Sequence, residues 1–79
     1  MSYVLADRIE IDPAVMMGKP VIHCTRIPVE LIMRKLGEGA TEAYLLDAYP
    51  RLTAEDIRAA LAYAADVLAH ATILLRPPA

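Results

Sequence analysis

The chain of 79 residues has room for one small domain, which excludes a Rossmann unit or a barrel. Apolar residues make up 57% of the chain, whereas globular domains average about 45–50%, so we expect exposed apolar surface that binds a second copy or a partner. Eight basic and ten acidic side chains leave a net charge of −2, which excludes the basic stripe of a non-specific nucleic-acid-binding protein.

The N-terminal region, residues 3–27, is typical of short extended segments. Residues 8–12 alternate polar and apolar side chains, as a half-buried strand does, and residues 21–24 suit a second strand. A Gly-Lys-Pro sequence interrupts the chain between them, and a proline favours extended backbone in the residue before it. We therefore predict a β-hairpin whose loop spans residues 13–19.

From residue 28 onward the apolar side chains recur with helical spacing. Pro28 suits the first turn of a helix, and one apolar face follows it at Val29, Ile32, Met33 and Leu36. Gly37 and Gly39 predict the end of this helix. Thr41 is expected to cap the N-terminus of a short second helix, which Pro50 ends.

The third predicted helix begins at Thr53, where Thr-Ala-Glu-Asp is a variant of the capping box, and runs toward Leu75. Its apolar stripe is wider than the ~100° that a surface helix needs. Two short helices and a hairpin cannot cover its length of about 30 Å, so we expect the C-terminal half to pack on a second copy or a partner. The side chains predicted for this interface are Leu61, Ala64, Leu68, Ala71, Leu75 and Arg76.

These elements predict a single, mainly α-helical domain over residues 1–79. It comprises a β-hairpin region (3–27), a three-helix region (28–75) and a tail (76–79). The tight connection between the last two helices suggests a helix-turn-helix-like arrangement.

In such motifs the N-terminal residues of the last helix reach the base edges, which makes DNA binding a hypothesis. The residues concerned are Arg51, Thr53, Glu55 and Arg58. The adjacent carboxylates of Glu55 and Asp56 repel phosphate, however. A three-helix fold without a nucleic-acid role is therefore the other interpretation.

The residue inventory argues against catalysis and against a cofactor. The chain has one cysteine and two distant histidines, and it lacks a glycine-rich phosphate loop, so we expect no enzyme. His23 and Cys24 are adjacent, but neighbours on a strand point to opposite faces, so we expect no metal site. The single cysteine, the lack of a signal peptide and the charges within residues 57–75 favour a cytoplasmic protein without a membrane span.

Several motifs follow one another in the order of a known family. They are Ile11-Asp12-Pro13, Gly18-Lys19-Pro20-Val21-Ile22, Thr25-Arg26-Ile27-Pro28-Val29, Gly39-Ala40-Thr41, Leu45–Pro50, Leu52–Ile57 and Ala59–Ala64. On these motifs, across roughly residues 7–66, the chain resembles the domain-of-unknown-function family 433. The resemblance implies a homeodomain-like helix-turn-helix fold behind a β-hairpin. It also implies an antitoxin of a type II toxin–antitoxin module, paired with a PIN-like ribonuclease toxin.

One motif of this resemblance departs from the family pattern, which has glycine where this chain has Cys24. Glycine indicates a positive φ or a close backbone approach, and Cys24 would be strained in the first case. Beside it, Thr25 is expected to act as a turn or capping hydroxyl. Arg26 is expected either to bind Asp12, Asp7 or a helix C-terminus, or to clamp a carboxylate or phosphate.

Sequence and resemblance together favour an antitoxin-like homodimer or higher oligomer that binds a PIN-like toxin through its last helix and tail. Arg76 is the tail cation that could enter the acidic centre of such a nuclease. Binding of operator DNA is a further hypothesis. The alternative is an oligomeric protein-interaction module that does not bind DNA.

Overall fold

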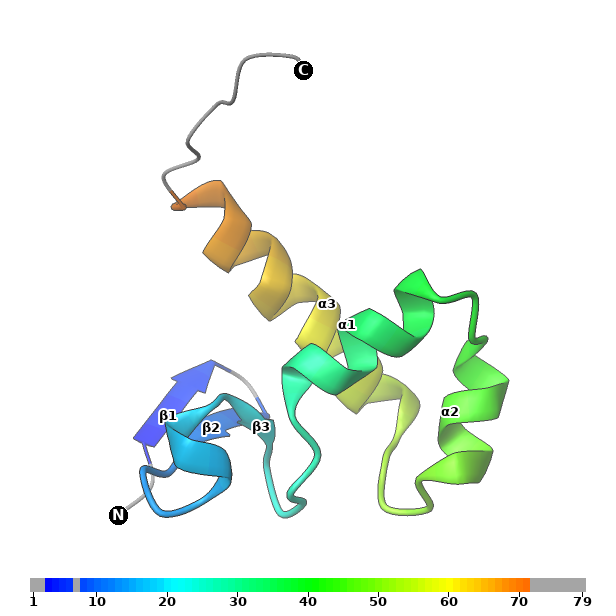
Figure 1. Cartoon of the computed structure of the whole chain (residues 1–79), viewed down its shortest axis with the longest axis horizontal. Helices are drawn as coiled ribbons and strands as arrows, with labels where there is room; N and C mark the ends of the chain where they lie inside the picture. Colours follow the sequence, from blue (N-terminus) through cyan, green and yellow to red (C-terminus); the bar gives the residue numbers. More distant parts are fainter. Residues whose placement is uncertain (1–2, 7, 72–79) are drawn as a thin grey trace, which may run out of the picture.

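The computed structural model describes residues 3–6 and 8–71, in which a small sheet and three helices surround one core (Figure 1). The antiparallel sheet has the strand order β1-β2-β3. In chain order the elements are β1 (Tyr3–Ala6), β2 (Ile9–Ile11), the 3-10 helix η1 (Met16–Gly18), β3 (Val21–Ile22), α1 (Val29–Gly37), α2 (Glu42–Ala48) and α3 (Ala54–Ala69). Three helices behind a small sheet are thus confirmed, whereas their homeodomain-like arrangement stays a prediction.

The sheet differs from the predicted hairpin in its length and in its number of strands. Arg8 and Asp12 flank β2 instead of belonging to it, and residues 23–24 form a turn after β3. The additional strand β1 pairs with β2 through a register that shifts between Val4 and Ala6. Its sequence lacks the polar–apolar alternation that marks a half-buried strand, so the pattern did not reveal it.

The residues on either side of α1 determine where this helix begins and ends. Pro28 is extended at φ −67° and ψ 142°. It therefore occupies the N-cap position, one residue before the first turn for which it was predicted. At the other end Gly39 has φ +100°, which glycine adopts without strain. The N–H of Gly39 donates to the carbonyl oxygen of Leu36 and that of Ala40 to Lys35, both at 3.0 Å. This Schellman motif turns the chain toward α2.

Threonine caps start the other two helices, as the sequence predicted. The hydroxyl of Thr41 accepts a hydrogen bond from the N–H of Tyr44 at 3.0 Å. In α3 the hydroxyl of Thr53 accepts from the N–H of Asp56 at 3.2 Å, and the Asp56 carboxylate accepts from the N–H of Thr53 at 3.0 Å. This reciprocal pair is a complete capping box, with aspartate in place of glutamate.

The core lies where the N-terminal half of α3 meets the sheet, α1 and α2. Its buried side chains are Ile9, Ile22, Val29, Ile32, Leu45, Leu52, Ile57 and Ala60. Beyond Ala60, none of the described residues of α3 is buried, and Figure 1 shows the helix continuing past α1. The helix ends at Ala69, earlier than the predicted Leu75, because His70 leaves the helical conformation and caps its C-terminus. Residues 72–79, which include the predicted tail, lie outside the described residues. Within the described part of the chain, no helix has both the length and the apolar character needed to cross a membrane.

Candidate functional site

A largely buried carboxylate joins the sheet to α3. The Arg8 guanidinium lies 3.1 Å from the Asp56 carboxylate, whose side chain is 8% exposed. Arg8 has φ +64°, a left-handed conformation that costs a non-glycine residue about 1–2 kcal/mol. Its carbonyl oxygen accepts a hydrogen bond from the N–H of His23 at 2.8 Å. These contacts tie Arg8, which lies in the turn between β1 and β2, to the segment after β3 and to the first turn of α3.

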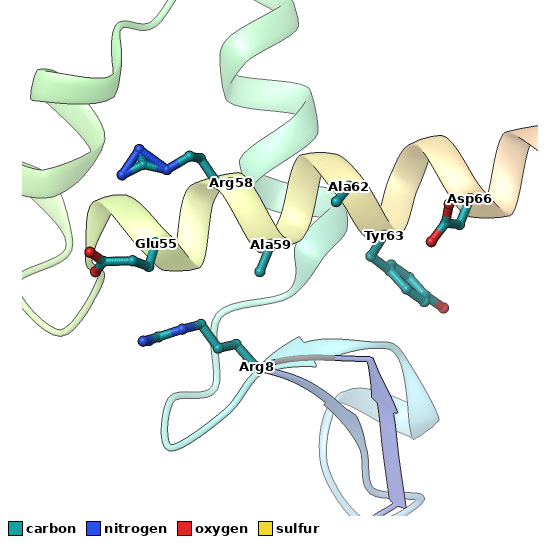
Figure 2. A pocket seen from close by; sticks show the side chains of 7 residues that line it. All are labelled: Arg8, Glu55, Arg58, Ala59, Ala62, Tyr63 and Asp66. Carbon is teal, nitrogen blue, oxygen red and sulfur yellow. The ribbon is translucent and has the colours of Figure 1, made fainter.

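An open groove of about 430 Å³ lies beside this ion pair. Figure 2 shows Arg8 extending from the sheet toward α3 and Tyr63 extending from α3 toward the sheet. The groove is lined by Arg8, Glu55, Arg58, Ala59, Ala62, Tyr63 and Asp66. Its two basic and two acidic side chains leave no net charge, so the groove has no preference for an anion.

The four residues of the DNA-binding hypothesis lie in the first turns of α3 and in the connection before it. The Thr53 hydroxyl is occupied as the cap of α3, and Glu55 and Arg58 line the neutral groove. Arg51 lies before α3, where its guanidinium donates to the carbonyl oxygen of Cys24 at 3.4 Å. The sequence did not reveal Arg8 as a groove residue, because Arg8 precedes its partner Asp56 in α3 by 48 positions along the chain.

The turn after β3 has the backbone that a glycine would favour. Cys24 is exposed and has φ +62°, so the strain foreseen from the family pattern is present. The Thr25 hydroxyl donates to the carbonyl oxygen of Ile22 at 2.8 Å and accepts from the N–H of Ile27 at 3.0 Å. This hydroxyl therefore stabilises the turn, and its one donor is not available to a ligand.

Substitution of Cys24 by glycine is expected to stabilise the protein. Relief of the left-handed strain contributes about 1–2 kcal/mol, and the greater entropy of glycine in the unfolded chain offsets about 0.5–1 kcal/mol. The net gain should be roughly 0.5–1 kcal/mol, measured by urea unfolding. Cys24→Ala keeps the strain and should stay within about 0.5 kcal/mol of the wild type. A destabilised glycine variant would contradict this explanation.

Arg26 follows this turn, and its side chain is exposed. Within the described part of the chain it forms no hydrogen bond or ion pair, so the expected bond to Asp12 or to a helix C-terminus is absent there. Arg26 lines a cavity of about 200 Å³ that also borders the α2–α3 connection. The residues around it are Thr25, Arg26, Ile27, Ala48, Tyr49, Pro50 and Arg51. Two are basic and none is acidic, in contrast to the neutral groove.

A third depression, of about 270 Å³, lies between α1 and the C-terminal half of α3 and is almost entirely apolar. We call it the apolar groove; its lining residues are Pro20, Val29, Glu30, Met33, Tyr63, Ala64, Val67 and Leu68. Val67 is 48% exposed and Leu68 66% exposed. Such large exposed apolar side chains on one helix face are typical of a surface that binds another protein.

The rim of the apolar groove carries one acidic residue whose charge is compensated. Glu30 accepts hydrogen bonds from the Lys19 ammonium at 2.8 Å and from the Arg34 guanidinium at 2.9 Å. The Lys19 ammonium, followed by the Arg34 guanidinium, lowers the pKa of the Glu30 carboxyl. The carboxylate is therefore paired at neutral pH and does not add an uncompensated charge to the groove.

Two of the residues predicted for an interface, Ala64 and Leu68, line the apolar groove, and Leu61 and Ala71 are exposed on the same segment. Leu75 and Arg76 lie outside the described residues. The α1 side of the groove was not foreseen for the interface, because the spacing of apolar residues does not reveal which helices meet. Among the described residues, no three His, Cys, Asp or Glu side chains gather closely enough to hold a metal ion.

Comparisons with known proteins found a matching family model and a similar solved structure. The family model described as "Protein of unknown function (DUF433)" matches residues 9–64. Among solved structures, the chain is similar to a DUF433 member protein from Anabaena variabilis, with 42% sequence identity and a TM-score of 0.73. The similarity covers 78% of this chain and 61% of that one. The comparison with curated proteins found no match.

Proposed function

The chain belongs to the DUF433 family, and on this premise we propose that it is a non-enzymatic, antitoxin-like protein that binds a PIN-like ribonuclease toxin. The resemblance to that family supports the class of partner. The observation that carries the proposal is the apolar groove, which continues along a helix that leaves the core. Because the chain spans 61% of its structural relative, the proposal concerns the activity of this domain.

The apolar groove has the chemistry of the centre of a protein interface. Interface centres are apolar and depleted of uncompensated charge, and the pairing of Glu30 meets that requirement at the rim. Burying a leucine or valine side chain contributes about 1.5–3 kcal/mol relative to leaving it exposed. Val67 and Leu68, which are 48% and 66% exposed, would therefore contribute free energy of binding when a partner covers them.

The second candidate function is an oligomeric interaction module that does not bind DNA. The observation that favours it is the neutral groove, in which Glu55 and Asp66 offset Arg8 and Arg58 at the start of α3. In this version the apolar groove binds a second copy of the chain, and the protein is a homodimer or a higher oligomer.

Co-expression with the product of the adjacent gene separates the two functions. Affinity purification through a tag on this chain, followed by mass determination of the intact complex, should yield a hetero-complex whose second subunit is a PIN-like nuclease. A nuclease assay on that complex should show less RNA cleavage than the isolated partner. If only homo-oligomers are recovered, the antitoxin proposal is wrong and the interaction module replaces it.

Leu68→Asp is expected to weaken partner binding at least tenfold, which corresponds to about 1.4 kcal/mol. The new carboxylate would lose its hydration inside an apolar interface without gaining a partner. Binding is measured by titration of the purified partner, with circular dichroism as a check on folding.

The matched control for that variant is Ala62→Asp, which adds the same charge to an exposed position of α3 in the neutral groove. It should bind the partner with an affinity close to that of the wild type. If Ala62→Asp abolished binding and Leu68→Asp did not, the partner would use the other face of α3.

A further inference from the structure

We propose that Arg26 and Arg51 form a site for a backbone phosphate of nucleic acid. The two residues are far apart in the sequence, yet they line the same cavity of about 200 Å³, between the turn after β3 and the α2–α3 connection. This site differs from the predicted DNA-binding set, from which it keeps Arg51 alone. It goes beyond the proposed function, because it uses neither the apolar groove nor a protein partner.

The residues that line this cavity include two arginines and no acidic side chain to balance their charge. Arg26 has no hydrogen bond or ion pair within the described part of the chain. Arg51 donates a single hydrogen bond to a neutral carbonyl oxygen, that of Cys24, at the long distance of 3.4 Å. Both guanidinium groups therefore retain most of their donors for an anion.

The number of donors favours a phosphate over a carboxylate. One guanidinium satisfies the two oxygens of a carboxylate through a bidentate pair. Two arginines that line one cavity suit a phosphate, whose oxygens point in several directions and can accept from both guanidinium groups. The cavity is also smaller than the ~300–1,000 Å³ typical of sites that enclose a whole ligand. It therefore fits one group of a larger molecule that lies across the surface.

Both arginines extend from backbone that the fold holds in place. On one side, the N–H of Ile22 donates to the carbonyl oxygen of Ile27 at 3.0 Å, which closes the loop of residues 22–27 that contains Arg26. On the other side, the N–H of Leu52 donates to the carbonyl oxygen of Tyr49 at 2.9 Å, and the Leu52 side chain is buried. The two backbone anchors are thus fixed before the ligand arrives, which lowers the entropy that binding must overcome.

Such a contact would position the protein on DNA without reading its sequence, because phosphates carry no base identity. The test uses a short duplex DNA and fluorescence anisotropy over a series of salt concentrations. For the double variant Arg26→Ala/Arg51→Ala, we expect affinity to fall at least about tenfold at low salt. The slope of log K against log salt should become shallower by about 0.9, the value for one phosphate contact.

The matched control is Arg34→Ala/Lys35→Ala, which removes the same charge from α1 away from the cavity. It should keep the slope of the wild type. A second variant, Arg26→Lys/Arg51→Lys, retains the charge and should bind DNA better than the alanine variant but less tightly than the wild type.

Three outcomes would overturn this site. They are a wild type that does not bind duplex DNA, an alanine variant that behaves like the control, and an alanine variant that loses the protein partner while its DNA affinity is unchanged. The last outcome would assign the cavity to a carboxylate of the partner. Neither arginine is buried, so the alanine variants should keep the thermal stability of the wild type, and the affinities can be compared directly.

Discussion

Leu45→Ala should lower the free energy of unfolding by about 2–5 kcal/mol, the range for deleting a buried leucine side chain. Leu45 is fully buried and is the one buried residue of α2, a helix of 7 residues that is too short to be stable without packing. Small domains have stabilities toward the lower end of about 5–15 kcal/mol. The variant should therefore be partly unfolded at physiological temperature.

Urea unfolding followed by circular dichroism measures this loss. The control is Leu61→Ala, which deletes the same atoms from a side chain that is 46% exposed. It should lower the free energy of unfolding by less than about 1 kcal/mol. Equal losses in the two variants would show that α2 does not pack on the core as described.

Asp56→Ala is expected to lower the free energy of unfolding by about 2–3 kcal/mol. The Asp56 carboxylate accepts hydrogen bonds from Arg8 and from the N–H of Thr53, so the substitution removes half of the capping box and the ion pair to the sheet together. It also leaves Arg8 in its left-handed conformation without the bond that compensates the strain.

Two further substitutions show which part of this effect comes from the contacts of Asp56. Asp56→Asn keeps an oxygen that can accept from Thr53 but loses the charge that attracts Arg8, so its loss should be intermediate. Asp66→Ala, at an exposed position of the same helix, should change the stability by no more than about 0.5 kcal/mol. If Asp56→Ala were as stable as Asp66→Ala, the link between sheet and helix would be energetically unimportant.

The features that could be predicted from the sequence depend on a few neighbouring residues. Thr41 and Thr53 each cap a helix through an N–H three residues onward, and Gly39 ends α1 through bonds to the turn before it. The strain at Cys24 was foreseen for the same reason, since a positive φ is a property of one residue.

The features that escaped prediction depend on contacts between distant segments. Strand β1 exists because β2 offers it a partner, and its own residues show no alternation. The pairing of Arg8 with Asp56 and the shared cavity of Arg26 and Arg51 join segments that only the tertiary structure brings together. Spacing along a chain identifies the face of a helix but does not identify what that face meets.

The position of Ala60 as the last buried residue of α3 divides this helix into two parts that should tolerate substitution differently. Substitutions before Ala60 disturb the core, so selection for folding restricts them. After it, Tyr63 and Ala64 are half-buried and the remaining positions are exposed, where a substitution changes stability by about 0.5 kcal/mol or less in the usual case. The outer half of α3 can therefore diverge between related proteins and change binding partner while the inner half preserves the fold.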